Sequence, residues 1–282
     1  MTSLRIGFSP CPNDTFIMAA LANRRIRSTL TLEPVLADVE TLNQWALEGR
    51  LEVTKLSFAA LGAVRNAYGL LYSGGAMGIG CGPLVVSRPG RIRDELDTGL
   101  IASPGEYTTA CLLFRLYLKK SPRIRHMVFS EIMPSVMRGE SDFGLVIHEG
   151  RFSYGQLGLT AILDLGEWWQ EQTDCLLPLG GIAVRRDLGP EIAATVDEAI
   201  RESLALGDKN SPATMDYVLS HAQELDVALV LQHIDLYVNR FSFDIGDEGR
   251  RAVEVLFQKA ENAGIIERSS LPLMAYEGSS SS

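Results

Sequence analysis

Positively charged runs are missing from this chain of 282 residues, in which 35 acidic side chains outnumber 26 basic ones and leave a formal net charge of −9. Nucleic acids and anionic membranes bind basic stripes, so neither is an expected partner. The nearest approach to a basic stripe is the cluster of Arg24, Arg25 and Arg27, and a solvated helix end explains this cluster more simply. No apolar run approaches the roughly 18 to 20 residues that span a bilayer, and no signal peptide is visible. We therefore expect a cytoplasmic protein without membrane insertion.

Cysteine is also sparse. Cys11, Cys81, Cys111 and Cys175 lie far apart, with no C-x-x-C pair and no histidine close in sequence. This spacing indicates neither a zinc site nor a redox pair. Without a secretory signal, reduced thiols are expected rather than two disulfides. The sequence thus predicts no metal site.

The sequence does contain a regular alternation of strand and helix patterns. Its length suggests about two domains. Its composition, with 46% hydrophobic and 22% charged residues, is typical of an ordinary globular protein. Asn13 or Asp14 is the expected cap of the first helix, and Asp38 opens the second. The strand patterns cover residues 3–9, 29–37 and 51–57, and the helix patterns cover residues 13–26, 38–50 and 58–68. This order predicts a parallel α/β unit.

Residues 73–83 hold five glycines, but a strand pattern follows them where a dinucleotide fingerprint needs a capped helix. We therefore reject a nucleotide site. The strand at residues 82–90 matches a second glycine-led strand at residues 180–189, and we interpret the pair as two crossings between lobes.

The predicted fold is therefore α/β with two lobes. The large lobe takes residues 1–86 and 182–282, with helical patterns only from Pro190 onward. The small lobe is a second α/β unit of residues 87–181, with strand patterns at residues 98–105, 125–130 and 141–149.

Polar residues gather where the predicted strands end. They are Ser9 to Asp14, Lys55 to Ser57, Ser103 to Thr109, and His148 with Glu149. Ligands of open parallel sheets bind at this edge, so we expect one site there. Ser57 and the pair Thr108 and Thr109 begin helices, whose free N–H groups favour a carboxylate or other anion. The alternative is that these hydroxyls only cap their helices.

His148 ends an apolar strand pattern at this edge, and the ordinary near-neutral pKa of histidine suits a general base. His126, His221 and His233 lack that setting, because the last two fall in predicted helices. Glu149 could orient the imidazole, although neighbours along a strand point to opposite faces. Arg151 could bind a carboxylate, but a surface ion pair is the simpler interpretation.

The loop from Ser9 to Asp14 is stiffened by Pro10 and Pro12, which fix two φ angles. This stiffness predicts one wall of a preorganised pocket, with Ser9, Cys11, Asn13 and Asp14 as candidate contacts. Cys11 could be a nucleophile near a helix start, but a residue that lines the cleft is favoured.

Five segments in this order and spacing closely resemble the 1,4-dihydroxy-6-naphthoate synthase family of menaquinone biosynthesis. They are GFSPCPNDTFI, VETLNQWALEGRLEVTKLSFAA, SGGAMGIGCGPLVV, YTTA and GLVIHEGRF. The resemblance implies a two-lobed fold similar to type 2 periplasmic binding proteins, with a closing cleft, hinge strands and no required cofactor. It also implies a futalosine-pathway lyase, which converts cyclic dehypoxanthinylfutalosine into 1,4-dihydroxy-6-naphthoate.

The same resemblance implies roles for particular residues. His148 matches the family's proton acceptor, and the substrate contacts fall on Lys55, Leu56, Ser57, Thr108, Thr109 and Ala110. Gly150 departs from the family, where a serine is common, and a hydrogen bond could be lost there.

Two other functions stay open at this point. One is a binding protein of the same fold for small carboxylates, and the other is chorismate dehydratase. The expected partner is a small-molecule substrate, and the sequence leaves the oligomeric state undetermined.

Overall fold

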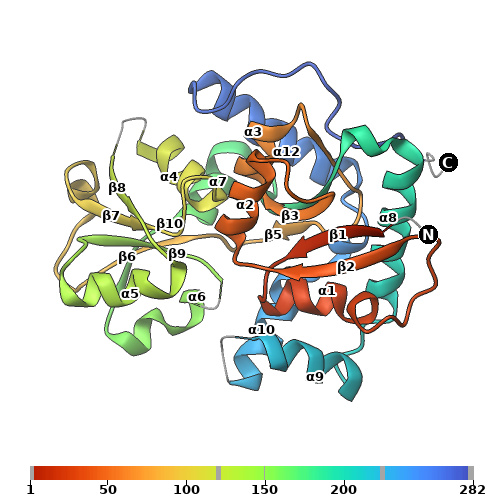
Figure 1. Cartoon of the computed structure of the whole chain (residues 1–282). Coiled ribbons are helices and arrows are strands. Elements are labelled where there is room, and N and C mark those ends of the chain that lie inside the picture. Colours follow the sequence, from red (N-terminus) through yellow and green to blue (C-terminus); the bar gives the residue numbers. More distant parts are fainter. Residues whose placement is uncertain (1–2, 119–121, 149, 223–225, 279–282) are drawn as a thin grey trace.

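The structure, a computed structural model, describes residues 3–118, 122–148, 150–222 and 226–278. These residues form two sheets that lie in different parts of the molecule (Figure 1). The first sheet has the strand order β2-β1-β3-β11-β4, with β5 paired to β11. Its strands are β1 Ser3–Phe8, β2 Thr31–Leu36, β3 Val53–Ser57, β4 Tyr68–Leu70, β5 Ala76–Gly78 and β11 Leu177–Arg185.

The predicted parallel arrangement is correct for only part of this sheet. β1 is parallel to β2 and to β3, whereas β11 runs antiparallel to β3, β4 and β5. The strand β11 returns from a distant part of the chain, so its direction is independent of the alternation that orders the first three strands. β2 contains Pro34, which lacks an amide hydrogen, and it lies at the sheet edge where this lack is tolerated.

The second sheet has the order β10-β6-β9-β7-β8. β7 is parallel to β8 and β9, and β6 is antiparallel to β9 and β10. Its strands are β6 Leu84–Ser87, β7 Leu100–Ser103, β8 Arg123–His126, β9 Phe143–Val146 and β10 Thr160–Asp164. The second sheet thus comes from one continuous stretch of chain, whereas the first is assembled from two.

Helices cover both sheets (Figure 1). Those of the first half are α1 Pro12–Ala22, α2 Val39–Leu47, α3 Phe58–Val64, α4 Thr109–Leu118, α5 Phe129–Arg138, α6 Gly150–Ser153 and α7 Leu165–Thr173. The predicted helical run after Pro190 consists of α8 Pro190–Ala205, α9 Pro212–His221, α10 Val227–Tyr237, α11 Arg240–Phe243 and α12 Gly246–Asn262. Short 3-10 turns cover Arg93–Asp97, Tyr154–Leu157 and Arg186–Leu188.

Helix α1 is buried nearly all round, because it packs between the first sheet and the helices α8, α9 and α10. It starts at Pro12 with Cys11 as its cap residue, so the prediction of Asn13 or Asp14 as cap is wrong. Proline suits the first helical position because its fixed φ is already helical and it has no amide hydrogen to satisfy. Asn13 and Asp14 therefore stand in the first turn, where their side chains can bond elsewhere.

Two further boundaries differ from the sequence patterns. The strand expected through Ser130 ends at His126, and α5 starts at Phe129. The strand expected through Glu149 ends at Val146, so His148 lies beyond it in a turn, and Glu149 lies outside the described residues. The helix expected to open at Asp38 begins there, and Asp38 caps α2 by accepting the backbone N–H groups of Glu40 and Thr41.

Among the described residues, no helix is both long enough and apolar enough to cross a membrane.

Candidate active site

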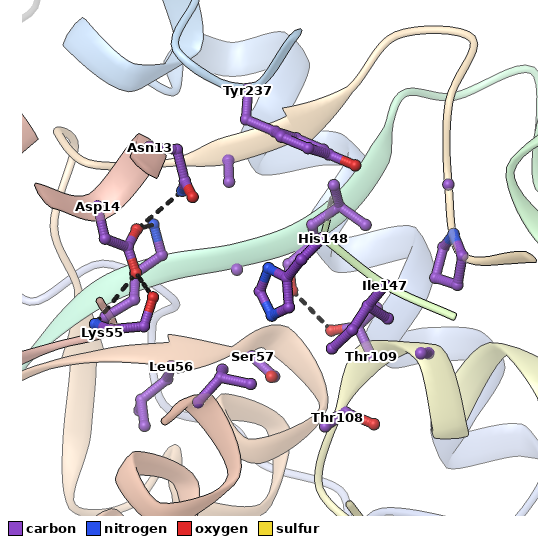
Figure 2. A pocket seen from close by; sticks show the side chains of 18 of the residues that line it. Asn13, Asp14, Lys55, Leu56, Ser57, Thr108, Thr109, Ile147, His148 and Tyr237 are labelled. Carbon is purple, nitrogen blue, oxygen red and sulfur yellow. Dashed lines mark hydrogen bonds and ion pairs between the residues drawn. The ribbon is translucent and has the colours of Figure 1, made fainter. Parts of the chain in front are cut away.

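One pocket collects the carboxyl ends of strands from both sheets (Figure 2). Ser9 follows β1, Ser57 ends β3, and His148 follows β9. The full lining is Ser9, Asn13, Asp14, Val39, Lys55, Leu56, Ser57, Ala76, Gly82, Pro83, Thr108, Thr109, Ala110, Ile147, His148, Arg151, Leu179, Gly180, His233 and Tyr237. Chain segments that are remote in sequence therefore converge on one cavity.

Most of the residues predicted for the site line this pocket, and Cys11 does not. The Cys11 sulfur instead lies against the imidazole, 3.4 Å from Nδ1 of His148 and 3.8 Å from its Nε2. Ser103 also stands outside the lining, with its hydroxyl donated to the Gly105 carbonyl. The roles proposed for the lining residues stay predictions.

Asp14 and Lys55 form a buried ion pair on one wall, with Nζ 2.8 Å from Oδ1 and both side chains 6% exposed. Burial by itself would raise the pKa of the Asp14 carboxyl, but the Lys55 ammonium and two hydrogen bonds from Ser9 outweigh it and lower the pKa. Lys55 also donates to the Gly74 carbonyl at 3.0 Å. The pair joins the first turn of α1 to strand β3.

Ser57 is held from its side chain and from its backbone by Asn43 of α2. The Asn43 amide oxygen accepts the Ser57 N–H at 3.0 Å, and its nitrogen lies 3.1 Å from the Ser57 hydroxyl oxygen. The Ser57 hydroxyl makes no bond that caps α3. The prediction that it could be a simple helix cap therefore does not describe its bonding.

Thr108 and Thr109 behave differently from Ser57. The Thr108 hydroxyl donates to the Gly105 carbonyl and accepts the N–H of Cys111, which is the bonding of a helix cap. The Thr109 hydroxyl donates to the Leu179 carbonyl of β11 at 2.7 Å and accepts the N–H of Ala59 at 3.4 Å. Thr109 thus ties the first turn of α4 to the first turn of α3.

His148 has a left-handed backbone with φ of 54°, which is uncommon for a residue other than glycine. Strained backbone of this kind is enriched at functional sites, where the surrounding structure holds it in place. Arg24 and Asp174 have the same backbone conformation and do not line the pocket. Phe129 contacts the ring edge-on, with 5.2 Å between ring centroids. In Figure 2 the imidazole projects into the pocket between the Lys55 wall and Thr109.

His233 of α10 stacks beside His148, with 6.1 Å between ring centroids and 20° between ring planes. Its Nε2 lies 2.9 Å from the Asn13 amide oxygen, and Asn13 in turn donates to Asp14 at 2.9 Å. Burial lowers the pKa of His233 to about 3, and the neighbouring His148 adds to the lowering. His233 is therefore neutral at physiological pH and donates its Nε2–H to Asn13.

Sequence reasoning assigned His233 to a helix remote from the site and so missed it. Its helical spacing indicated only a buried face, and nothing in the sequence showed that α10 packs against α1. Val39, Tyr237 and Leu179 were missed for the same reason, because their partners lie far away along the chain.

Arg151 lines the pocket and forms the ion pair that the simpler interpretation expected, although this pair is largely buried. Its guanidinium lies 2.7 Å from the Asp164 carboxylate and donates to the Gly82 carbonyl at 2.5 Å. The side chain is 20% exposed. These bonds fix Arg151 beside the segment where β6 begins.

Gly150 faces apolar neighbours. A Cβ at this position would lie 2.7 Å from a Val146 methyl group and 3.4 Å from the Met133 methyl group. The β-carbon of a serine there would be crowded by the Val146 methyl group, which glycine avoids.

Within the part of the chain that the structure describes, no group of three or more His, Cys, Asp or Glu side chains could hold a metal ion. The pocket lining offers two imidazoles, one ammonium group, one guanidinium group and one carboxylate, from His148, His233, Lys55, Arg151 and Asp14. Hydroxyl, amide and apolar side chains make up most of the rest of the lining.

Comparison with known proteins gives a consistent result. The profile of a family described as menaquinone biosynthesis matches residues 4–262. A protein of Thermus thermophilus named 1,4-dihydroxy-6-naphtoate synthase is 50% identical over 273 residues, covering 97% of this chain and 99% of that protein. A protein of Streptomyces coelicolor with the same name is 42% identical, covering 94% and 95% respectively.

Solved structures agree on the fold. Protein AF1704 of Archaeoglobus fulgidus superposes with a TM-score of 0.88 at 34% identity, covering 94% of this chain and 98% of its own. The aliphatic sulphonate binding protein SsuA of Escherichia coli, a periplasmic protein, has a TM-score of 0.64 at 11% identity, covering 95% and 94%. The fold is that of periplasmic binding proteins, as the sequence motifs predicted.

Proposed function

Because this chain belongs to the menaquinone biosynthesis family, we propose that it acts as a 1,4-dihydroxy-6-naphthoate synthase and converts cyclic dehypoxanthinylfutalosine into 1,4-dihydroxy-6-naphthoate. Two relatives of that name match it over nearly the full chain, so the family resemblance drawn from the motifs is confirmed. The observation that carries the proposal is the convergence of His148, Ser57 and Thr109 on one pocket. We assign the reaction to the carbon–carbon lyases.

The proposed base is His148. Its imidazole takes the proton from a hydroxyl group of the sugar-derived ring, and the oxygen forms a carbonyl as the adjacent carbon–carbon bond breaks. The electron pair of that bond passes into the neighbouring ring system, which becomes aromatic, and the sugar-derived fragment leaves. Aromatisation supplies the driving force, so the protein has only to orient the hydroxyl group and accept its proton.

Polar groups on the opposite wall suit the substrate's oxygens. The Ser57 hydroxyl and the Lys55 ammonium face the pocket, and they are donors for a carboxylate or carbonyl oxygen. We propose that Leu56, Thr108, Thr109, Ala110, Ser9, Asn13 and Asp14 complete the contacts. The donors are held by other parts of the chain before substrate arrives, so little reorganisation is needed.

We also propose that residues 1–86 with 182–282 and residues 87–181 act as two lobes that close over the substrate. Closure would exclude water from the pocket and bring His148 to the donors on the other wall. The cytoplasmic location expected from the sequence is part of the same proposal.

The two alternative functions are not favoured. A carboxylate-binding protein of this fold gives no use to a strained histidine beside a cysteine, and the near full-length relatives have the synthase name rather than that of a dehydratase. Incubating the purified protein with cyclic dehypoxanthinylfutalosine or with chorismate separates the three functions. Naphthoate formation, followed by absorbance and mass, supports the proposal, and turnover of chorismate alone contradicts it.

The role of His148 is tested by His148→Gln. This change keeps a hydrogen-bonding side chain but removes the base, so we expect a loss of kcat of about 100-fold to 10,000-fold. The exposed His126→Gln is the matched control and should leave kcat unchanged. Wild-type turnover by His148→Gln would contradict the assignment.

Cys11→Ala tests the remaining nucleophile hypothesis. If the sulfur only packs against His148, kcat falls modestly, by less than about 10-fold, because the base remains in place. A loss as large as that of His148→Gln, together with a covalent adduct in the mass of the stalled wild-type protein, would instead support a Cys11 nucleophile.

A further inference from the structure

Asn43 of α2 is completely buried and lies directly behind the pocket wall, although it does not line the pocket. Its amide nitrogen lies 3.1 Å from the Ser57 hydroxyl, 3.1 Å from Oε2 of Glu40 and 3.2 Å from the Tyr107 carbonyl oxygen. Its amide oxygen accepts the Ser57 N–H at 3.0 Å. One side chain thus bonds to strand β3 and to the loop that leads into α4.

The orientation of this amide is fixed by its partners. Since the Ser57 N–H can only donate, the atom that faces it must be the amide oxygen, and the atom that faces Glu40 and the Tyr107 carbonyl must be the nitrogen. The nitrogen therefore donates to the Ser57 hydroxyl oxygen. The Ser57 hydroxyl accepts from Asn43 and keeps its single proton for another partner.

That proton is directed to the pocket. The Ser57 hydroxyl makes no cap bond to α3, and among the described residues it donates to no other group. Ser57 also lines the pocket. The hydroxyl is therefore set as a donor, which matches an electron-rich oxygen such as a carboxylate or a carbonyl.

The second side of Asn43 holds the start of α4. The Tyr107 carbonyl accepts from Asn43, and the Tyr107 N–H donates to Oε1 of Glu40 at 3.3 Å. Gly105 makes this approach possible, because its φ is 155° and a Cβ there would lie 2.3 Å from the Glu40 side chain. The first turn of α2 therefore fixes the backbone immediately before Thr108.

We propose that Asn43 is a positioning residue that sets the Ser57 hydroxyl as a hydrogen-bond donor to a carboxylate or carbonyl oxygen of the substrate and holds it in register with the start of α4. This proposal rests on the proposed function. It assigns a role to a residue that never touches the substrate and acts through Ser57.

The decisive variant is Asn43→Asp. The introduced carboxylate has the same shape as the amide and still accepts the Ser57 N–H, but its second oxygen now faces the Ser57 hydroxyl as an acceptor. The hydroxyl turns its proton to this second oxygen and presents lone pairs to the substrate oxygen. We expect kcat/KM to fall about 10-fold to 100-fold, the size expected for a hydrogen bond to a charged group.

Gln44→Glu is the matched control. It makes the same amide-to-carboxylate change one residue along the helix, and Gln44 bonds only to Oε1 of Glu40 among these groups. We expect kcat/KM to change less than about threefold, since an exposed charge contributes little. A loss equal to that of Asn43→Asp would show that added charge on α2 is the cause, and would overturn the proposal.

A double-mutant cycle with Ser57→Ala separates positioning from general structural damage. If Asn43 acts through Ser57, adding Asn43→Asp to Ser57→Ala costs less than about threefold further in kcat/KM. If the two losses multiply, the proposal is wrong. Should Asn43→Asp fail to fold, as judged by thermal unfolding, Asn43→Ala replaces it in the same cycle, with the same two outcomes.

The wild-type protein in the same assay distinguishes the two levels of failure. If wild type forms naphthoate and the cycle is multiplicative, only the role of Asn43 falls. If wild type forms no naphthoate, the proposed function falls, and the role of Asn43 falls with it.

Discussion

The helices α3 and α4 both begin next to a hydroxyl residue, but the two hydroxyl groups make different hydrogen bonds. Each helix follows a strand end with a hydroxyl residue, Ser57 in one case and Thr108 in the other. The Thr108 hydroxyl donates its proton to the preceding loop, at Gly105, and accepts an N–H group of its own helix, from Cys111. Ser57 bonds instead to Asn43 of a neighbouring helix. At these two helix starts, the hydroxyl left available to a ligand is that of Ser57, which bonds to a neighbouring helix instead of its own.

The largest expected effect comes from Lys55→Met, which removes the buried ammonium group from β3, two residues before Ser57. This change leaves the buried Asp14 carboxylate unpaired, and we expect the free energy of unfolding to fall by about 3 to 5 kcal/mol in urea titrations. Amide exchange should increase more at Ser57 than at Cys111, because Lys55 belongs to β3. Adding Asp14→Asn should recover part of the stability. A change under about 1 kcal/mol would mean that water already compensates the charge.

Ser57→Ala should affect catalysis more than stability. We expect kcat/KM to fall about 10-fold to 100-fold, because a donor to a charged or carbonyl oxygen is lost. The free energy of unfolding should change by only about 1 kcal/mol, since one Asn43 hydrogen bond loses its acceptor. Steady-state kinetics and urea unfolding on the same preparation measure both quantities.

Thr108→Ala should show the opposite ranking. Loss of the cap is expected to reduce the free energy of unfolding by about 1 kcal/mol, and kcat/KM should fall less than in Ser57→Ala. Thr108→Ser keeps the hydroxyl and should restore stability. If Thr108→Ala reduced kcat/KM more than Ser57→Ala, the distinction between the two helix starts would be wrong.

Glu40 lies near the starts of both α3 and α4, and its substitution by glutamine is expected to give the smallest effect of the four changes. Burial raises the pKa of its carboxyl group despite hydrogen bonds from Asn43, Gln44 and Tyr107. The folded state therefore holds the proton more tightly than the unfolded state, so stability decreases as the pH rises from the usual glutamate pKa through the folded pKa. Glu40→Gln should raise the melting temperature slightly at pH 7 and not at about pH 4. A variant less stable than wild type only at pH 7 would contradict this sign.

Local patterns were sufficient to predict much of the architecture. The alternation of strands and helices over the first 68 residues, the helix start at Asp38 and the helical run after Pro190 all follow from periodicity and capping chemistry. The reversed direction of β11 did not, because pairing between Gly180 and Ser57 depends on contacts across a long stretch of the chain.

The site was predicted unevenly for the same reason. Ser57, Thr109 and His148 stand at strand ends, a position that local reasoning can identify. His233 and Asn43 lie on helices with ordinary buried faces, and only tertiary packing brings one to His148 and the other to Ser57. The different bonding of Ser57 and Thr108 was equally inaccessible, since the residue that decides it is 14 positions away.

The continuity of the second sheet has a consequence for how the protein is made. All its strands lie between Leu84 and Asp164, so a ribosome has delivered the whole sheet before β11 emerges. Until then β3 and β4 lack the strand that separates them, and the wall with Ser57 has an open edge. The nascent chain can therefore complete the second sheet first, and the wall with Ser57 is completed only when β11 pairs with β3 and β4 late in synthesis.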